Sequence, residues 1–144
     1  MIKIGITGSI ASGKSTVAKM FAGKKYPLFN ADHEVNKIYQ RNSFKNKICR
    51  KFDFKNKKNI KSKIKKIIKK NKKYIKELEK IIHPLVRKEL RRFSVRNKRK
   101  TLLFFEIPLL IESKLMKNFN IIIFVNSNKA LRLKRYLSMK LIGL

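Results

Sequence analysis

The stretch of sequence that decides the fold of this chain is Gly8-Ser9-Ile10-Ala11-Ser12-Gly13-Lys14-Ser15, and Thr16 follows it. It matches the pattern G-x-x-x-x-G-K-[ST], in which glycines let the backbone curl so that its N–H groups converge on phosphate oxygens. At average composition a chance match is expected in on the order of one chain in two hundred of this length. The pattern therefore predicts a loop that binds the phosphates of a nucleoside triphosphate.

The segments on either side of this loop support the same interpretation. Ile2 to Thr7 is rich in β-branched residues, as is typical of a short strand, and the apolar residues from Val17 to Ala22 follow helical spacing. A helix that begins inside the loop adds positive potential at the phosphates. Lys14 can reach the β- and γ-phosphates, and the Ser15 hydroxyl can bind Mg²⁺. A plain Gly/Ser turn before a helix is the competing interpretation, and the strand–loop–helix context argues against it.

The rest of the chain alternates predicted strands and helices. Further strands are expected at 28–30, 101–107 and 121–125, and helices from about Asp32, at 60–68, at 75–93 and from Ala130 onward. Residues 41–73 carry the weakest pattern and the most lysine, and Pro84 must either kink the 75–93 helix or start a new one there. We predict one α/β domain over 1–144, with a parallel sheet, flanking helices and a helical insert. The core covers about 1–31 and 97–144, and the insert covers about 32–96.

Composition limits the class of protein further. The chain has 144 residues, with 39 Lys and Arg against 8 Asp and Glu, and a formal net charge of +31. Its 43% hydrophobic content excludes a disordered basic tail, and no stretch is long and apolar enough to span a bilayer. The single cysteine, Cys49, fits a reducing cytoplasm. The basic excess suggests polyanionic partners, although an A/T-biased coding sequence would produce the same abundance of Lys, Ile, Asn and Phe.

Acidic residues at two predicted strand ends are candidates for phosphoryl-transfer chemistry, because ligands of open parallel sheets gather at the carboxyl ends of the strands. Asp32 could accept the proton of an attacking hydroxyl or act as the N-cap of the next helix. Glu106 could hold the water shell of a metal or be an ordinary surface residue. His83 is alone in an apolar helical stripe, which by itself favours a structural role, and we expect no zinc site.

Four motifs in this order resemble the bacterial dephospho-CoA kinase family. They are the phosphate-binding loop, Asn30-Ala31-Asp32, Ile82-His83-Pro84-Leu85-Val86 and Pro108-Leu109-Leu110-Ile111-Glu112. The resemblance runs from Met1 to about Arg135. It implies transfer of the γ-phosphoryl group of ATP to the ribose 3′-hydroxyl of dephospho-CoA, with Mg²⁺, as the last step of coenzyme A synthesis.

The resemblance also implies roles for individual residues. Asp32 is the base at the acceptor hydroxyl and shares catalysis with Lys14. The residues implied to hold ATP are Gly8, Ala11, Ser12, Gly13, Lys14, Ser15 and Thr16. Those implied to contact the substrate are Asp32, His83 and Arg135, and those implied to bind Mg²⁺ through water are Ser15 and Glu106. The helical insert is the implied CoA-binding subdomain, whose lysines suit a ligand with several phosphate charges.

The sequence departs from the family pattern at three places. Asn30 stands where the family has the first Asp of Asp-Ala-Asp, and Met139 stands where the family usually has its next arginine after Arg135. The family's lid, its further helix and its last strand lie beyond Leu144. We therefore expect a fold without the lid and that strand. We also expect impaired turnover, because lid arginines stabilise charge on the transferring phosphoryl group.

Two other functions remain open. Another nucleoside or nucleotide kinase with the same loop would be stimulated by a nucleoside monophosphate rather than by dephospho-CoA. A basic nucleic-acid-binding protein with a vestigial loop would keep its affinity after Lys14→Ala and lose it steeply with salt. The basic residues spread over several elements rather than one reading helix, which disfavours a nucleic-acid partner. We expect no membrane partner.

Overall fold

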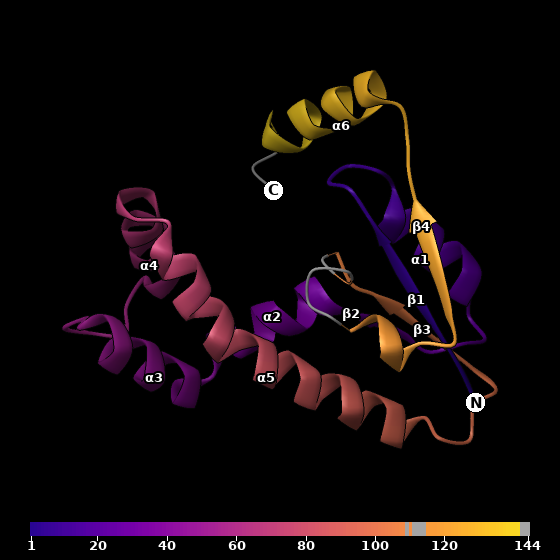
Figure 1. Cartoon of the computed structure of the whole chain (residues 1–144), viewed down its shortest axis with the longest axis horizontal. Coiled ribbons are helices and arrows are strands. Elements are labelled where there is room, and N and C mark those ends of the chain that lie inside the picture. The colour runs from indigo at the N-terminus through magenta and orange to yellow at the C-terminus, as the bar shows by residue number, and fades with distance from the viewer. Residues whose placement is uncertain (109, 111–114, 142–144) are drawn as a thin grey trace. The chain divides into compact units, whose positions relative to one another are not determined.

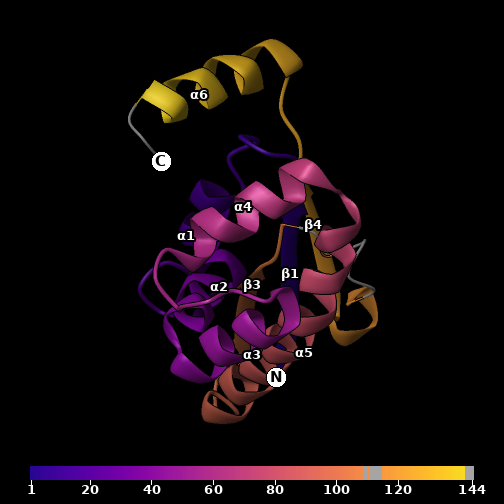
Figure 2. The same ribbon diagram turned by 90° about the vertical axis from the view of Figure 1, so that its left-hand side faces the viewer.

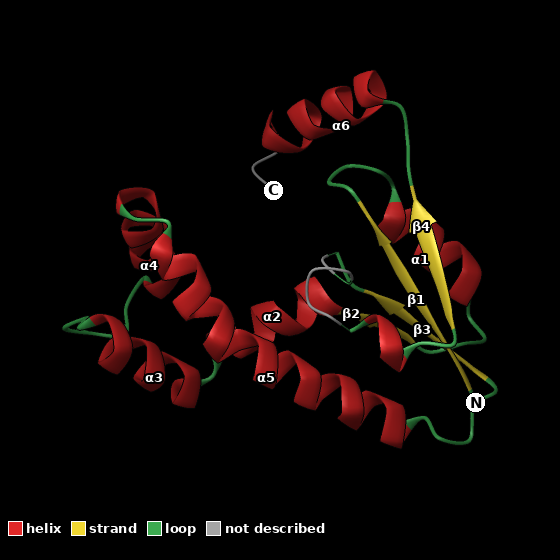
Figure 3. Ribbon diagram, viewed as in Figure 1, coloured by secondary structure: helices red, strands yellow, loops and turns green. Residues whose placement is uncertain are grey.

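The computed structural model of the chain describes residues 1–108, 110 and 115–141, with side chains as far as Met139. Figure 3 shows the distribution of helices and strands. In chain order the elements are β1 (Ile2–Gly8), α1 (Lys14–Ala22), β2 (Leu28–Asn30), α2 (Ala31–Gln40), α3 (Asn42–Phe52), α4 (Ile60–Lys70), α5 (Lys73–Arg96), β3 (Leu102–Glu106), the 3₁₀ turn η1 (Met116–Asn118), β4 (Ile121–Val125) and α6 (Lys129–Leu141). The chain forms two compact units, a sheet unit (1–31 and 92–144) and a helical unit (32–91).

The strands of the sheet unit form one parallel sheet in the order β2-β3-β1-β4 (Figure 1). In the register, Glu106 at the end of β3 lies opposite both Ile6 of β1 and Asn30 of β2. Gly8, the last residue of β1, lies opposite Val125, the last residue of β4. The carboxyl ends of all four strands therefore share one edge, and the predicted α/β fold with a parallel sheet and flanking helices is confirmed.

Helix α1 covers one face of this sheet. Successive side chains of a strand point to opposite faces, so Ile4 and Ile6 of β1 share a face. They form a buried cluster with Phe104 of β3 and with Ala18 and Ala22 of α1. The two alanines let the helix approach the sheet closely, and this packing fixes the direction in which α1 leaves the phosphate-binding loop.

Aromatic rings cover the opposite face. Phe105 of β3 lies 5.8 Å, ring centre to ring centre, from Phe29 of β2, 5.4 Å from Phe93 and 5.2 Å from Phe119. These tilted and edge-on contacts are the favourable geometries for aromatic pairs. Phe93 comes from the last turns of α5, so the end of that long helix packs on the sheet.

The helical unit, whose helices Figures 1 and 2 show as ribbons, has its own apolar core, made by side chains from all of these helices. Its buried members are Ile38 of α2, Phe44 and Ile48 of α3, Ile60 and Ile64 of α4, and Ile81 and Val86 of α5. Lysines fill the outward positions of the same helices, which explains how so basic a segment can fold. None of the helices in the described part of the chain is long and apolar enough to cross a membrane.

One expectation about residues 41–96 needs correction, and one of the two alternatives for Pro84 is excluded. Helix α3 lies within residues 41–73, where the sequence pattern is weakest, and its signal is the spacing of Phe44, Ile48 and Phe52 at every fourth residue. No new helix begins at Pro84, because α5 runs as one helix through it. The missing N–H of this proline leaves one carbonyl of the preceding turn without its helical partner. The predicted helix at 60–68 is confirmed as α4.

Candidate active site

The phosphate-binding loop connects β1 to α1 and depends on unusual backbone angles. Gly13 has φ +92° and Ala11 has φ +58°, both in the left-handed region that L-residues rarely adopt. A Cβ atom on Gly8 would lie 2.2 Å from the carbonyl oxygen of Val125, so only glycine fits where β1 passes β4. The Ser12 N–H donates to the Ser9 carbonyl at 3.2 Å and closes the turn. The curled backbone leads directly into α1, whose first N–H groups have no partner within the helix.

One buried hydroxyl in this loop is available to a ligand. Ser12 is 4% exposed, and its Oγ has no hydrogen-bond partner among the residues that the structure describes. A buried hydroxyl without a partner costs free energy unless something bonds to it. The loop therefore offers a side-chain donor and backbone donors to the same anion, which suits a phosphate group. Lys14 is half-buried at the first position of α1, and Thr16 is exposed two residues later.

A buried carboxylate lies beside the start of α1. Glu106 is 2% exposed, and its Oε1 accepts a hydrogen bond from the Ser15 hydroxyl. Its Oε2 accepts a hydrogen bond from Asn30 Nδ2 at 2.6 Å. The parallel register explains this arrangement, since it brings the ends of β2 and β3 together beside β1. Hydroxyl and carboxylate oxygens are the ligands that Mg²⁺ prefers, so Ser15 and Glu106 could hold that ion directly or through water.

The part that Asn30 plays here is not predicted from the sequence. There the residue is only a departure from the family pattern, yet its amide is the second hydrogen-bond donor to Glu106. The chemical signal was present, because an asparagine can donate to a carboxylate whereas an aspartate would repel it. What the sequence lacked was the strand register that joins two residues 76 positions apart.

A guanidinium group from α6 lies against the loop. Arg135 Nη1 donates to the Ala11 carbonyl at 3.4 Å, and a Cβ atom on Gly13 would lie 3.4 Å from the same nitrogen. Helix α6 follows β4, which itself ends opposite the end of β1. The arginine therefore adds positive charge at the point where phosphates would lie.

Two candidate residues belong to the helical unit. Helix α2 begins at Ala31, so Asp32 lies in its first turn rather than at its N-cap. A carboxylate in the first turn still interacts favourably with the helix dipole. His83 is half-buried within α5, directly before Pro84. Their roles stay predictions. Glu112, the last residue of the fourth motif, lies outside the described residues.

Comparison with known proteins supports a functional assignment. The family description "Dephospho-CoA kinase" matches residues 2–142, almost the whole chain. The chain belongs to the dephospho-CoA kinase family. Membership identifies it as a kinase that uses ATP.

Individual relatives agree with this placement. The dephospho-CoA kinase of Bartonella henselae is 37% identical over 136 residues, which cover 92% of this chain and 70% of the relative. That of Rickettsia bellii is 34% identical over 135 residues, with coverages of 94% and 70%.

Solved structures agree in fold. A Thermus thermophilus crystal structure superposes with a TM-score of 0.81 at 29% identity, over 99% of this chain and 73% of that one. The dephospho-CoA kinase from Campylobacter jejuni gives a TM-score of 0.61 at 24% identity, over 97% and 96% of the two chains. At this lower identity the second likeness supports the dephospho-CoA kinase fold alone.

Proposed function

We propose that this member of the dephospho-CoA kinase family transfers the γ-phosphoryl group of ATP to the ribose 3′-hydroxyl of dephospho-CoA, giving coenzyme A and ADP. The observation that carries the proposal is the pairing of the Ser15 hydroxyl with the buried carboxylate of Glu106 at the end of a phosphate-binding loop. This pairing occurs in a chain that matches the family over residues 2–142. The single Cys49 and the need for ATP favour the cytoplasm as the place of the reaction.

In this proposal the loop holds the triphosphate of ATP. Backbone N–H groups between Gly8 and Thr16 and the Ser12 hydroxyl donate to phosphate oxygens, while the Lys14 ammonium balances charge on the β- and γ-phosphates. Arg135 adds a second cation at the loop, where its guanidinium contacts the Ala11 carbonyl. These groups act by position and charge, which supply most of the catalysis in phosphoryl transfer.

Ser15 and Glu106 are the residues that would hold Mg²⁺, through their oxygen atoms and intervening water. When bound, this ion would supply positive charge that offsets the negative charge developing on the transferring phosphoryl group. Asn30 keeps the Glu106 carboxylate oriented by donating to its Oε2. Because both oxygens of the carboxylate are engaged, the side chain is fixed before any ligand arrives.

Asp32 and the helical unit complete the proposal on the acceptor side. Asp32 takes the proton of the 3′-hydroxyl while the oxygen of that hydroxyl forms a bond to the γ-phosphorus of ATP. The bond between the γ-phosphorus and the oxygen that bridges it to the β-phosphate breaks, and ADP is released. Lysines of the helical unit (32–91) attract the phosphates of dephospho-CoA, and His83 contributes to its binding. Dephospho-CoA thus binds to the helical unit and ATP to the sheet unit.

ADP release from Mg-ATP, measured with and without dephospho-CoA, tests this function. We expect dephospho-CoA to stimulate release and Lys14→Ala to abolish the stimulation. Lys19→Ala is the matched control, because Lys19 is an exposed lysine on the same helix outside the loop and its loss should leave the rate unchanged. Stimulation by nucleoside monophosphates instead of dephospho-CoA would contradict the assigned acceptor. ATP binding without stimulation by any acceptor would contradict the proposed turnover.

A further inference from the structure

A basic pocket lies between α3 and α5, entirely within the helical unit. It has a volume of about 460 Å³ and opens to solvent, and its lining residues are Lys47, Arg50, Lys51, Glu77, Lys80 and Ile81. We call it the α3–α5 pocket. Its volume lies in the range of small-molecule sites. None of its lining residues takes part in the phosphate-binding loop or in the proposed roles of Asp32 and His83.

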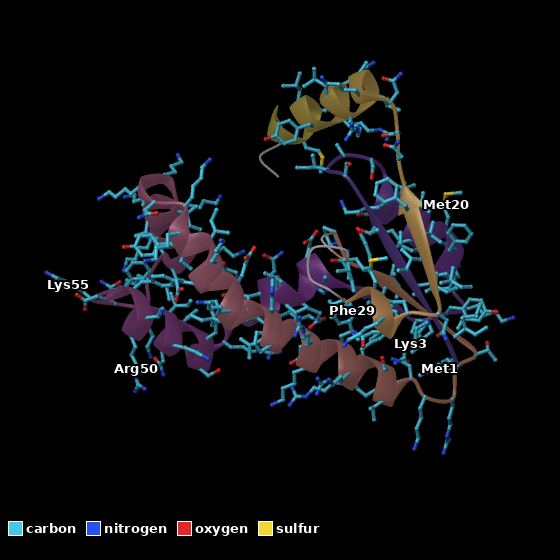
Figure 4. The ribbon with its side chains drawn as sticks, in the orientation of Figure 1. Met1, Lys3, Met20, Phe29, Arg50 and Lys55 are labelled. Carbon is cyan, nitrogen blue, oxygen red and sulfur yellow. The ribbon has the colours of Figure 1, made fainter. Side chains whose placement is uncertain are left out.

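The cations converge because of helical spacing. Lys47, Arg50 and Lys51 are at positions i, i+3 and i+4 of α3, so they share one face of that helix. Lys80 stands one turn after Glu77 on α5, and the two helices pack through their buried isoleucines. Arg50 is labelled in Figure 4, where its side chain projects outward from α3.

One carboxylate orders part of this cluster. Glu77 binds Lys51 Nζ at 2.8 Å and Lys80 Nζ at 2.9 Å, one ammonium on each helix. An ammonium has three donors, so each lysine keeps donors for a further acceptor while its position is fixed. Fixing such flexible side chains in advance lowers the entropic cost of binding a ligand.

The pocket carries more positive charge than its own carboxylate can neutralise. Lys51 and Lys80 lower the pKa of Glu77 to about 2, chiefly by their hydrogen bonds to it, so this group is ionised at any physiological pH. It faces four cationic side chains. Two of them, Lys47 and Arg50, make no hydrogen bond or ion pair with any residue in the described part of the chain. The planar guanidinium can bind a phosphate group through two parallel hydrogen bonds.

We propose that the α3–α5 pocket is a second anion site, which binds a small molecule carrying adjacent phosphate groups. One phosphate lies against Arg50 and Lys47 at the mouth, and the next reaches the free donors of Lys51 and Lys80, with Ile81 beneath. A second phosphate suits the pocket better than a single one, because the cations are divided between two helices. No residue of this pocket is among those that the proposed function assigns to ATP, to Mg²⁺ or to the proton of the acceptor hydroxyl, so a failed titration at the pocket would leave that function standing.

The test is a residue-resolved NMR titration of the full chain with sodium pyrophosphate at physiological ionic strength. We expect saturating shifts in the amides of residues 47–51 and 77–81, besides those of the phosphate-binding loop. The double variant Lys47→Gln/Arg50→Gln should weaken binding at the pocket by at least about tenfold, which equals about 1.4 kcal/mol. The shifts that pyrophosphate causes in the phosphate-binding loop of this variant should equal those of the parent, which would show that its fold is intact.

The matched control is Lys55→Gln/Lys57→Gln, which removes the same charge from the connection between α3 and α4. Both lysines are exposed, and Figure 4 places Lys55 at the far end of that connection. The control should bind pyrophosphate as the parent does. If both double variants lost the same affinity for pyrophosphate, or if the shifts grew without saturating, the anion would be attracted only by the net charge of the protein. Either result would overturn the proposal. Orthophosphate binding as tightly as pyrophosphate, or saturation only by an RNA oligonucleotide, would overturn the assigned ligand class.

Discussion

At the scale of single residues, the candidate site depends on how one buried charge is compensated. The Glu106 carboxylate is almost fully buried and accepts hydrogen bonds from Ser15 and Asn30. Hydrogen bonds to an ionised acceptor are stronger than neutral ones, and a buried carboxylate without them would be costly. The amide at position 30 therefore stabilises the negative charge in the absence of any cation. An aspartate at that position, as in the family pattern, would need a cation to do the same.

The variant Asn30→Asp tests this compensation. It places a second carboxylate against Glu106 and removes the hydrogen bond to its Oε2. We expect the free energy of unfolding without metal to fall by about 1–3 kcal/mol. Mg²⁺ should then raise the thermal midpoint of this variant more than that of the parent. Circular dichroism melts with and without MgCl₂ measure both effects.

The control for this experiment is Asn30→Ala, which removes the donor without adding a charge. Its response to Mg²⁺ should equal that of the parent, so that any extra response in Asn30→Asp reports the carboxylate pair. An Asn30→Asp protein that is as stable as the parent and has the same response to Mg²⁺ would show that Glu106 and residue 30 do not share a cation site.

At the scale of elements, the sequence predicts a helix or strand best where its local pattern of residues agrees with the contacts that the element makes in the fold. The first strand and the helix after it were predictable because the glycine loop, the β-branched run and the apolar spacing all agree there. Helix α3 was not predicted because three residues, mostly basic, stand between each of its apolar residues Phe44, Ile48 and Phe52, which form a stripe only on a helical surface. Glu106 could be chosen as a strand end, but its hydrogen bonds to residues 91 and 76 positions away depend on the strand register. No local pattern encodes that register.

The contact between α3 and α5 makes stability depend on pH through Glu77. Its two lysine partners lower its pKa from 4.5 to about 2, so the folded state binds its proton less readily than the unfolded chain. The resulting stabilisation is fully present above about 4.5 and is lost as the pH falls towards 2. We expect Glu77→Gln to be less stable than the parent at neutral pH, and the difference to narrow below pH 4.5. Urea unfolding midpoints between neutral pH and about 3 measure it.

A matched control for this titration is Glu79→Gln, which removes the same charge from the same helix. No ion pair with Lys51 or Lys80 is lost with it, so its difference from the parent should stay nearly constant over the acidic range. A Glu77→Gln difference that is equally constant with pH would mean that the two lysines do not hold the Glu77 carboxylate in solution.

At the scale of the whole molecule, the net charge of +31 opposes folding. Eight acidic residues cannot pair with 39 basic ones, so like charges face each other over much of the surface. Such self-repulsion destabilises a compact state. More than half of the basic residues lie in the helical unit, which has fewer residues than the sheet unit, so repulsion is denser there. The apolar core that α2 to α5 share has to overcome this repulsion.

Salt should therefore stabilise this protein, and the helical unit most of all. At an ionic strength of 0.15 M the screening length is about 8 Å, short enough to weaken repulsion between lysines on separate helices. If screening relieves about 1 kcal/mol, the thermal midpoint should rise by roughly 4 °C between low and physiological ionic strength. Amide hydrogen exchange in α3 and α4 should slow more than in β1 and β3, where the core is less charged.

Sodium and potassium chloride must act alike, because screening depends on ionic strength and not on the cation. A midpoint that falls with salt would mean that attraction between charges outweighs their repulsion, and that the few carboxylates stabilise the fold more than the excess lysines oppose it.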